Sequence, residues 1–116
     1  MAIHFATTTP QTLLNNFDAR IAQTEPKGKI TTWEKASDGH YTHKATEWNK
    51  KAWLLPKVLN SQLTFNIIRP NGSNVTSQVY AYYHGHLIET FLNHFDTSFS
   101  NAVSSALPES ADHCTA

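Results

Sequence analysis

The sequence predicts an α+β domain in which an antiparallel four-stranded sheet carries two helices on one of its faces. The chain has 116 residues, of which 40% are hydrophobic, so it is long enough to form one domain with its own core. Apolar residues recur with helical spacing near both ends, whereas the middle alternates in short runs separated by turn residues. The order helix, two hairpins, helix is satisfied most simply by a sheet with one covered face and one open face.

The first helix is expected over about 9–23. Thr9 is a suitable N-cap residue, and Pro10 follows at a position where its missing N–H costs nothing. An apolar stripe continues from there and consists of Leu13, Leu14, Phe17 and Ile21. The sequence Glu-Pro-Lys-Gly at 25–28 then ends the helix.

The first hairpin is expected from strands at about 29–36 and 41–48. The residues between them, 37–40, read Ser-Asp-Gly-His, and Asp-Gly suits the positive-φ positions of a tight turn. The run 53–59 follows and contains Pro56. It is either an edge strand, where proline is tolerated, or a packed loop.

The second hairpin is expected from strands at about 62–69 and 75–83. Leu63, Phe65 and Ile67 alternate along the first of these strands and should share one face. Residues 70–74 connect the two strands, and the Pro-Asn-Gly within them supplies the dihedral angles of a turn.

The second helix is expected over about 86–106, after a bend at Gly85. Its apolar stripe runs from Leu87 to Ala106, and Asp-Thr-Ser at 96–98 should kink or restart it, because these residues favour caps over helix interiors. Pro108 ends the helix. The chain is then a single α+β domain over 1–108 followed by a flexible polar tail over 109–116.

The open face of the sheet is the candidate binding surface. Successive side chains of a strand point to opposite faces, and small aliphatic residues suit the face covered by helices. The aromatic and polar residues of the other set should point outward; those predicted to bind are Trp33, Lys35, Trp48, Asn66, Tyr80, Tyr82 and His84. Aromatic rings with polar tips are enriched at binding surfaces, although Trp, Tyr and Thr also suit any strand face.

Metal binding is suggested only weakly by the seven histidines. His84 and His86 lie two residues apart, and Asp38, His40 and His43 surround the first turn. The two groups could form a mixed site if they met in space. However, His-x-His alone is an unspecific pattern, and the sequence contains neither His-Glu-x-x-His nor a pair of cysteines. We therefore predict no metal site and no cofactor.

Catalysis and nucleic-acid binding are the alternatives to protein binding. No Gly-x-Ser-x-Gly is present, and the four glycines are isolated, so no phosphate loop exists. An enzymatic or small-ligand domain remains open as the alternative, with a pocket lined by Tyr80, Tyr82, His84 and Trp33. Stacking of single-stranded nucleic acid on the aromatic residues is a weaker alternative, because the net charge is zero and no Lys or Arg follows Arg69.

The leading prediction is a small non-enzymatic binding or inhibitory module. It would bind a protein partner, or a second copy of itself, through the open sheet face and the flanking turns at 37–40 and 70–74. The sequence shows no leader and no 18-residue apolar run, so we expect no membrane partner and a cytoplasmic location. The single cysteine, Cys114, cannot form an internal disulfide.

Overall fold

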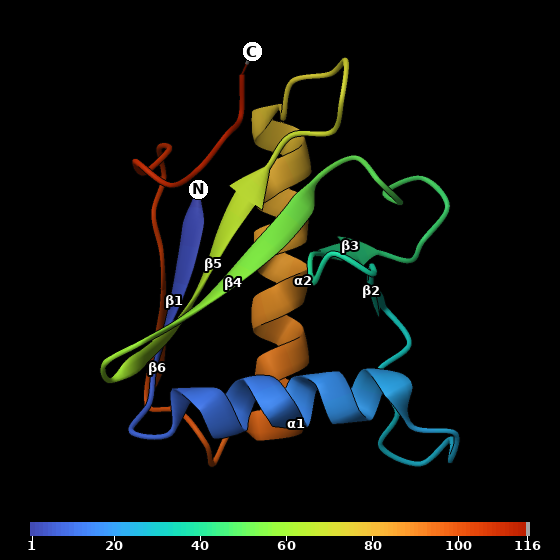
Figure 1. Ribbon diagram of the computed structural model, residues 1–116, viewed down its shortest axis with the longest axis vertical. Helices are drawn as coiled ribbons and strands as arrows, with labels where there is room; N and C mark the ends of the chain where they lie inside the picture. Colours follow the sequence, from blue (N-terminus) through green and yellow to red (C-terminus); the bar gives the residue numbers. More distant parts are fainter. Residues whose placement is uncertain (116) are drawn as a thin grey trace.

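The protein, described for residues 1–115 by a computed structural model, forms one six-stranded antiparallel sheet with two helices. The strands are arranged across the sheet in the order β2-β3-β4-β5-β1-β6 (Figure 1). In chain order the elements are β1 (Ala2–Ala6), α1 (Pro10–Ala22), β2 (Trp33–Lys35), β3 (Tyr41–His43), β4 (Trp53–Leu59), β5 (Gln62–Ile68), α2 (Ser77–Phe95) and β6 (Asn101–Ser104). The mixed α+β class is confirmed, whereas the expected number of four strands is wrong.

Both helices pack on the same face of the sheet, here called the inner face. The ring centroids of Phe17 on α1 and Phe91 on α2 lie 5.0 Å apart, and both rings contact Phe65 on β5. In Figure 1, α2 lies behind β4 and β5 while α1 runs across one end of the sheet, so the viewer looks onto the opposite, outer face. Within residues 1–115, no helix combines the length and the apolar character needed to cross a membrane.

The strand register assigns the side chains of the central strands to these two faces. Directly paired residues of antiparallel strands point to the same side. Ile3 on β1 is paired with Phe65, and Leu54 on β4 is paired with Ile67, so all four residues are on the inner face and fully buried. The residues between them in sequence point to the outer face.

Residues 75–83, expected to be a strand, belong instead mostly to the first half of α2. Thr76 caps this helix, because its side-chain oxygen accepts a hydrogen bond from the Val79 amide. An apolar side chain then recurs at every fourth position: Val79, Tyr83, Leu87, Phe91 and Phe95. The β-branched and aromatic residues of 75–83 favour a strand locally, but burial of the helical stripe against the inner face outweighs that preference.

Gly85, expected at a bend between strand and helix, lies inside α2 and is exposed. Glycine in a helix interior costs roughly 0.5–1 kcal/mol relative to alanine. A Cβ at this position would meet no atom within 4 Å. We therefore expect Gly85→Ala to raise the free energy of unfolding by about 0.5–1 kcal/mol, measured by urea denaturation.

The control for this substitution is Gly39→Ala. A Cβ at Gly39 would also meet open space, but its φ of 88° is a conformation that alanine rarely adopts. Alanine should therefore lower the stability at Gly39 and raise it at Gly85. A loss of stability in Gly85→Ala would contradict the helical placement.

The C-terminal helix ends at Phe95, not near residue 106 as expected. The chain turns where Asp-Thr-Ser was expected to kink or restart the helix, and the Ser98 amide donates to the Phe95 carbonyl (2.8 Å). Phe99 then packs edge-on against Phe5 of β1, with 5.2 Å between ring centroids. This contact leads the chain into β6, which pairs with β1 at the edge of the sheet.

β1 has no counterpart among the expected elements. Ile3 and Phe5 point inward and are fully buried, while His4 between them points outward. The strand lies between β5 and β6 and pairs with both. Five residues of alternation are too few to stand out in the sequence, although they satisfy the strand period.

The first hairpin is confirmed, but its strands are shorter than expected and end at Lys35 and His43. The run 53–59, left open between strand and loop, is β4 and pairs with β5 along its whole length. Pro56 is tolerated there because β3 pairs with β4 only through Tyr41 and Leu54. The second half of β4 therefore has no strand on that side.

Residues 109–115, the described part of the expected flexible tail, lie along the end of β5. The His113 amide donates to the Ile67 carbonyl (2.9 Å), and the Arg69 amide donates to the His113 carbonyl (2.6 Å). The Cys114 carbonyl accepts from the Val75 amide (2.8 Å). The first of these bonds uses a carbonyl of β5 just beyond Asn66, which pairs with Ala2 of β1. The other two bonds use amides that follow β5 in the chain.

Candidate binding surface

The predicted binding residues, all of which were expected to lie on strands, do not form one exposed surface. Trp33 is fully buried on the inner face, so its expected outward orientation is wrong. Asn66 points outward but is buried, because its side-chain amide donates to Asp112 in the C-terminal segment (2.9 Å). Lys35 is partly exposed and pairs with Asp18 on α1, with 2.9 Å between Nζ and Oδ2. These three side chains therefore hold elements together.

Tyr80, Tyr82 and His84 lie on α2 and not on a strand, so they do not share a face by alternation. The Tyr80 hydroxyl donates to the Ala106 carbonyl (2.8 Å). His84 is buried, and its Nδ1 donates to the Tyr80 carbonyl (2.7 Å). Burial lowers the pKa of His84, which is the main reason to treat it as neutral.

Trp48 and Tyr82 are brought together with two histidines in what we call the aromatic–histidine cluster: Trp48, Tyr82, His86 and His43. The Trp48 and Tyr82 rings are stacked, with centroids 3.9 Å apart and planes at 16°. Tyr82 is stacked on His86 in turn, at 4.1 Å and 26°. His86 Nδ1 lies 3.0 Å from Nε2 of the buried His43 on β3. The cluster thus joins α2 to β3 and to the loop 44–51.

The two histidine groups considered for metal binding meet through this single pair. His43 and His86 are in contact, whereas His84 is on another side of α2 and His40 bonds to Asp38 in the first turn. Within the described residues, no three His, Cys, Asp or Glu side chains are placed to hold a metal ion. The geometry of the pair therefore supports hydrogen bonding between imidazoles.

The outer face carries apolar side chains that are not among the predicted binding residues. The register places Trp53, Leu55, Leu59 and Ile68 on this face, and we call them the outer-face patch. Leu59 is 44% exposed, and the other three are half-buried. A solvent-exposed sheet face normally carries polar side chains, so three apolar residues out of the four outward positions of β4 are unusual.

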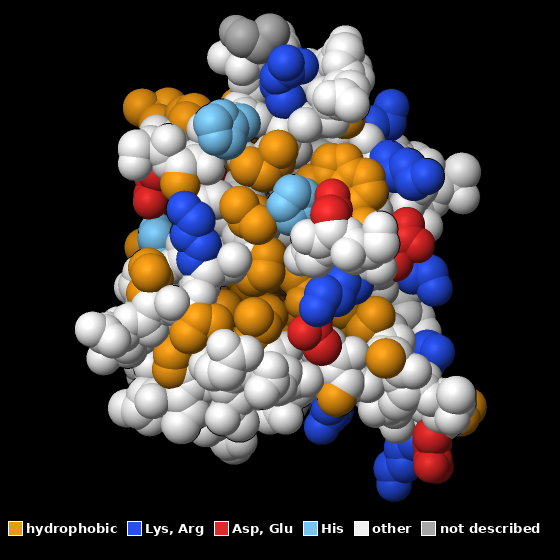
Figure 2. All heavy atoms as spheres, in the orientation of Figure 1, with side chains coloured by type: hydrophobic (Ala, Val, Ile, Leu, Met, Phe, Trp, Pro, Cys, Tyr) orange, Lys and Arg blue, Asp and Glu red, His pale blue; other side chains and the backbone are white. Residues whose placement is uncertain are grey.

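Figure 2 shows hydrophobic side chains gathered over the middle of the outer face, with basic side chains beside them. Lys57 is exposed and lies on the same face between Leu55 and Leu59, and Arg69 directly follows Ile68. His4 on β1 faces the same side and is paired with Glu109, with 2.9 Å between Nε2 and Oε2. The patch is therefore bordered by the exposed Lys57 and by the hydrogen-bonded His4–Glu109 pair.

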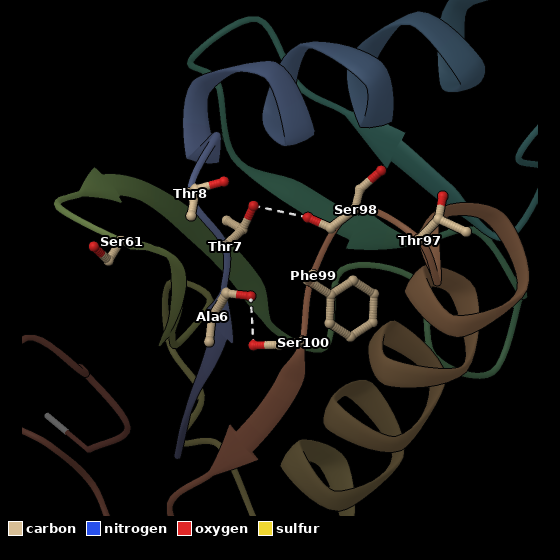
Figure 3. A pocket seen from close by; sticks show the side chains of 8 residues that line it. All are labelled: Ala6, Thr7, Thr8, Ser61, Thr97, Ser98, Phe99 and Ser100. Carbon is tan, nitrogen blue, oxygen red and sulfur yellow. Dashed lines mark hydrogen bonds between the residues drawn. The ribbon is translucent and has the colours of Figure 1, made fainter.

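Surface hollows formed by the described residues lie away from this patch. The first, of about 450 Å³, is formed where the β1–α1, β4–β5 and α2–β6 connections meet (Figure 3). Its lining consists of Phe99, Ala6 and the hydroxyl residues Thr7, Thr8, Ser61, Thr97, Ser98 and Ser100. The Thr7 hydroxyl is already used, because it donates to the Ser98 carbonyl (2.7 Å). This lining contains no group that titrates near neutral pH, so it offers no acid or base for catalysis.

The second hollow, of about 460 Å³, is lined by Lys50, Lys51 and residues of the turn at 70–74. Neither hollow is lined by Trp33, Tyr80, Tyr82 or His84. The four residues of the alternative pocket therefore do not surround either of these spaces.

No protein-family model, curated protein or solved structure matches this chain. The role of the outer-face patch is therefore inferred from the chemistry of its own residues. Its signal in the sequence is that Trp53–Leu59 reads WLLPKVL, with apolar residues at both odd and even positions. Such a run predicts a strand that is apolar on both faces.

Proposed function

We propose that the protein is a non-enzymatic binding module whose outer-face patch binds another protein. The observation that carries this proposal is the one-sided cover of the sheet. Both helices pack on the inner face, yet the outer face of β4 and β5 keeps Trp53, Leu55, Leu59 and Ile68 partly exposed. Apolar side chains left partly exposed on an uncovered sheet face are typical of interaction sites.

The chemistry of the border indicates the kind of partner. Lys57 provides positive charge beside the patch, and the Glu109 carboxylate is hydrogen-bonded to His4. A partner that presents apolar side chains flanked by carboxylates would complement this surface, with the apolar contact supplying affinity and the charges supplying orientation. Trp53 is the expected anchor, because tryptophan is among the residues that dominate interface energetics.

Site-specific photo-cross-linking tests the proposal. A benzophenone side chain is placed at Leu55, within the patch, and at Leu92, which is 53% exposed on α2 and serves as a matched control. In an extract of the cells that make the protein, position 55 should give a defined adduct that position 92 does not give. An excess of unlabelled wild-type protein should suppress this adduct, whereas an excess of the Leu55→Lys variant should not.

Light scattering on the purified protein distinguishes a partner from self-association. If the adduct is a second copy of the chain and the protein is dimeric in solution, the occupant is the protein itself. Equal adducts at positions 55 and 92, or suppression by Leu55→Lys as strong as by wild type, would overturn the assignment of the patch.

A further inference from the structure

The hydrogen bonds of His43 determine which ring nitrogen carries its proton. The Ala45 amide donates to His43 Nδ1 (3.0 Å), so Nδ1 of the neutral ring has no proton and Nε2 has one. His43 therefore donates from Nε2 to His86 Nδ1 (3.0 Å), and neutral His86 carries its own proton on Nε2. A metal bound at His43 Nε2 would require the proton to move to Nδ1, where it would face the Ala45 N–H.

A proton added to either ring breaks one of these two bonds. On His86 it would occupy Nδ1 and set an N–H against the N–H of His43. On His43 it would occupy Nδ1 and set an N–H against the Ala45 amide. The pair is consequently compatible with its surroundings only when both rings are neutral.

The surroundings of His43 also disfavour its charge. The ring is only 2% exposed and contacts the rings of Trp33 on β2 and of Tyr82 and Tyr83 on α2. Burial lowers the pKa of His43, and the charge of a protonated His86 lowers it further.

The acidic groups around the pair only partly offset the lowering of the His43 pKa. Glu47 in the loop 44–51 raises the pKa of His43 through its charge. Glu34 on β2 reaches the loop by accepting from the Asn49 side-chain amide, which also donates to the His43 carbonyl. Lys44, adjacent to His43 in the chain, is exposed.

The pair supports the stack of aromatic rings described above. Tyr82 lies on His86, and Trp48 lies on Tyr82, so the position of the His86 ring determines where the Trp48 ring can rest. The backbone of the loop is anchored separately, because the Trp48 carbonyl accepts from the Tyr83 hydroxyl and the Lys50 amide donates to Thr42 Oγ1.

We propose that the His43–His86 pair is an acid-sensitive latch that holds the Trp48 ring against α2 when both imidazoles are neutral and releases it when the pair takes up a proton. The loop backbone stays anchored, so the change is confined to the ring stack. This proposal does not depend on the function proposed for the outer-face patch, because it concerns a different surface and is read out in the isolated protein.

The latch can be followed by fluorine NMR on protein labelled with 5-fluorotryptophan, from about pH 8 to about pH 5. The Trp48 resonance, assigned with Trp48→Phe, should shift together with the ring signals of both histidines. These signals should all change over one common pH interval, because a proton added to either ring breaks a hydrogen bond of the pair. The Trp53 resonance should stay constant and serves as the internal control.

Two substitutions of His86 and one control substitution complete the test. His86→Gln retains an acceptor for His43 and cannot titrate, so it should abolish the shift at Trp48, whereas His40→Gln in the first turn should leave it unchanged. His86→Lys introduces a permanent charge and a donor, and at neutral pH it should reproduce the acid position of the Trp48 resonance.

The His86→Lys result does not require acid and so is independent of any unfolding at low pH. A Trp48 resonance that stays at its neutral position in His86→Lys, or that still shifts with pH in His86→Gln, would overturn the latch. Titration of the two histidine rings with separate, independent midpoints would do the same.

Discussion

Asp112→Ala should lower the free energy of unfolding by about 3–5 kcal/mol, although this residue lies only four positions from the end of the chain. The carboxylate is fully buried. Its Oδ1 accepts from the Asn66 side-chain amide (2.9 Å) and the Ile67 amide (3.0 Å), and its Oδ2 accepts from the Glu109 amide (2.7 Å). Alanine leaves three donors without a partner, and each unsatisfied buried donor costs about 1–3 kcal/mol.

Urea denaturation of three variants checks this prediction. Asp112→Asn keeps one acceptor oxygen but turns an amide N–H toward the Glu109 amide, so its stability should fall between those of wild type and Asp112→Ala. Asp38→Ala is the control, because its side chain is 61% exposed and its loss should change stability by less than about 0.5 kcal/mol. Equal stabilities of the two alanine variants would contradict the ordered placement of the C-terminal segment.

Trp33→Ala should cost about 3–5 kcal/mol, the range for removal of a large buried aromatic side chain. Trp33 has no exposed surface, and its indole N–H donates to the Thr90 hydroxyl on α2 (3.0 Å). Its ring also packs edge-on against Tyr83, with centroids 5.6 Å apart. Alanine would leave a cavity between β2 and α2 and a hydroxyl without its donor.

Trp53→Ala is the matched comparison, because it removes the same side chain from the outer face. Trp53 is half-buried, so we expect a loss of only about 1 kcal/mol. Thermal and urea unfolding of both variants measure the difference between the two faces. If Trp53→Ala were the more damaging change, the inner and outer faces would be exchanged and the proposed patch would be part of the core.

The elements that the sequence predicts well are those whose local signals agree with their burial. The first helix has a Thr9–Pro10 start and an apolar stripe, and it forms over Pro10–Ala22 as expected. The strand at 62–69 alternates clearly and forms β5 over Gln62–Ile68. In these segments propensity, period and turn residues all point to the same structure.

The segment 75–83 was mispredicted because two of its signals disagree. Val75, Val79 and the tyrosines have strand propensity, but the spacing from Val79 to Phe95 is helical over more than four turns. An apolar stripe that repeats with helical spacing along a long segment is better evidence for a helix than the composition of nine residues is for a strand. The reason is that the fold buries the stripe. The helix also runs through Gly85, a residue that usually marks a boundary.

Three of the seven predicted binding residues, Tyr80, Tyr82 and His84, lie in that segment, and their common face was therefore not predicted correctly. With 75–83 read as a strand, Tyr80, Tyr82 and His84 are assigned to one face by alternation, and the helix distributes them differently. The contacts that cover Asn66 come from residues 109–115, far away in sequence. No local pattern shows which distant segment will cover a given strand position.

The position of β1 has a consequence for how the chain folds as it is synthesised. Ile3 pairs with Phe65 on one side and with Ser104 on the other, so the first strand finds its neighbours only after most of the chain has left the ribosome. Pairings of such long sequence separation slow folding, because loop entropy is lost before the contacts form. Ile3 and Phe5 therefore remain without strand partners until β5 and β6 are available to pair with them.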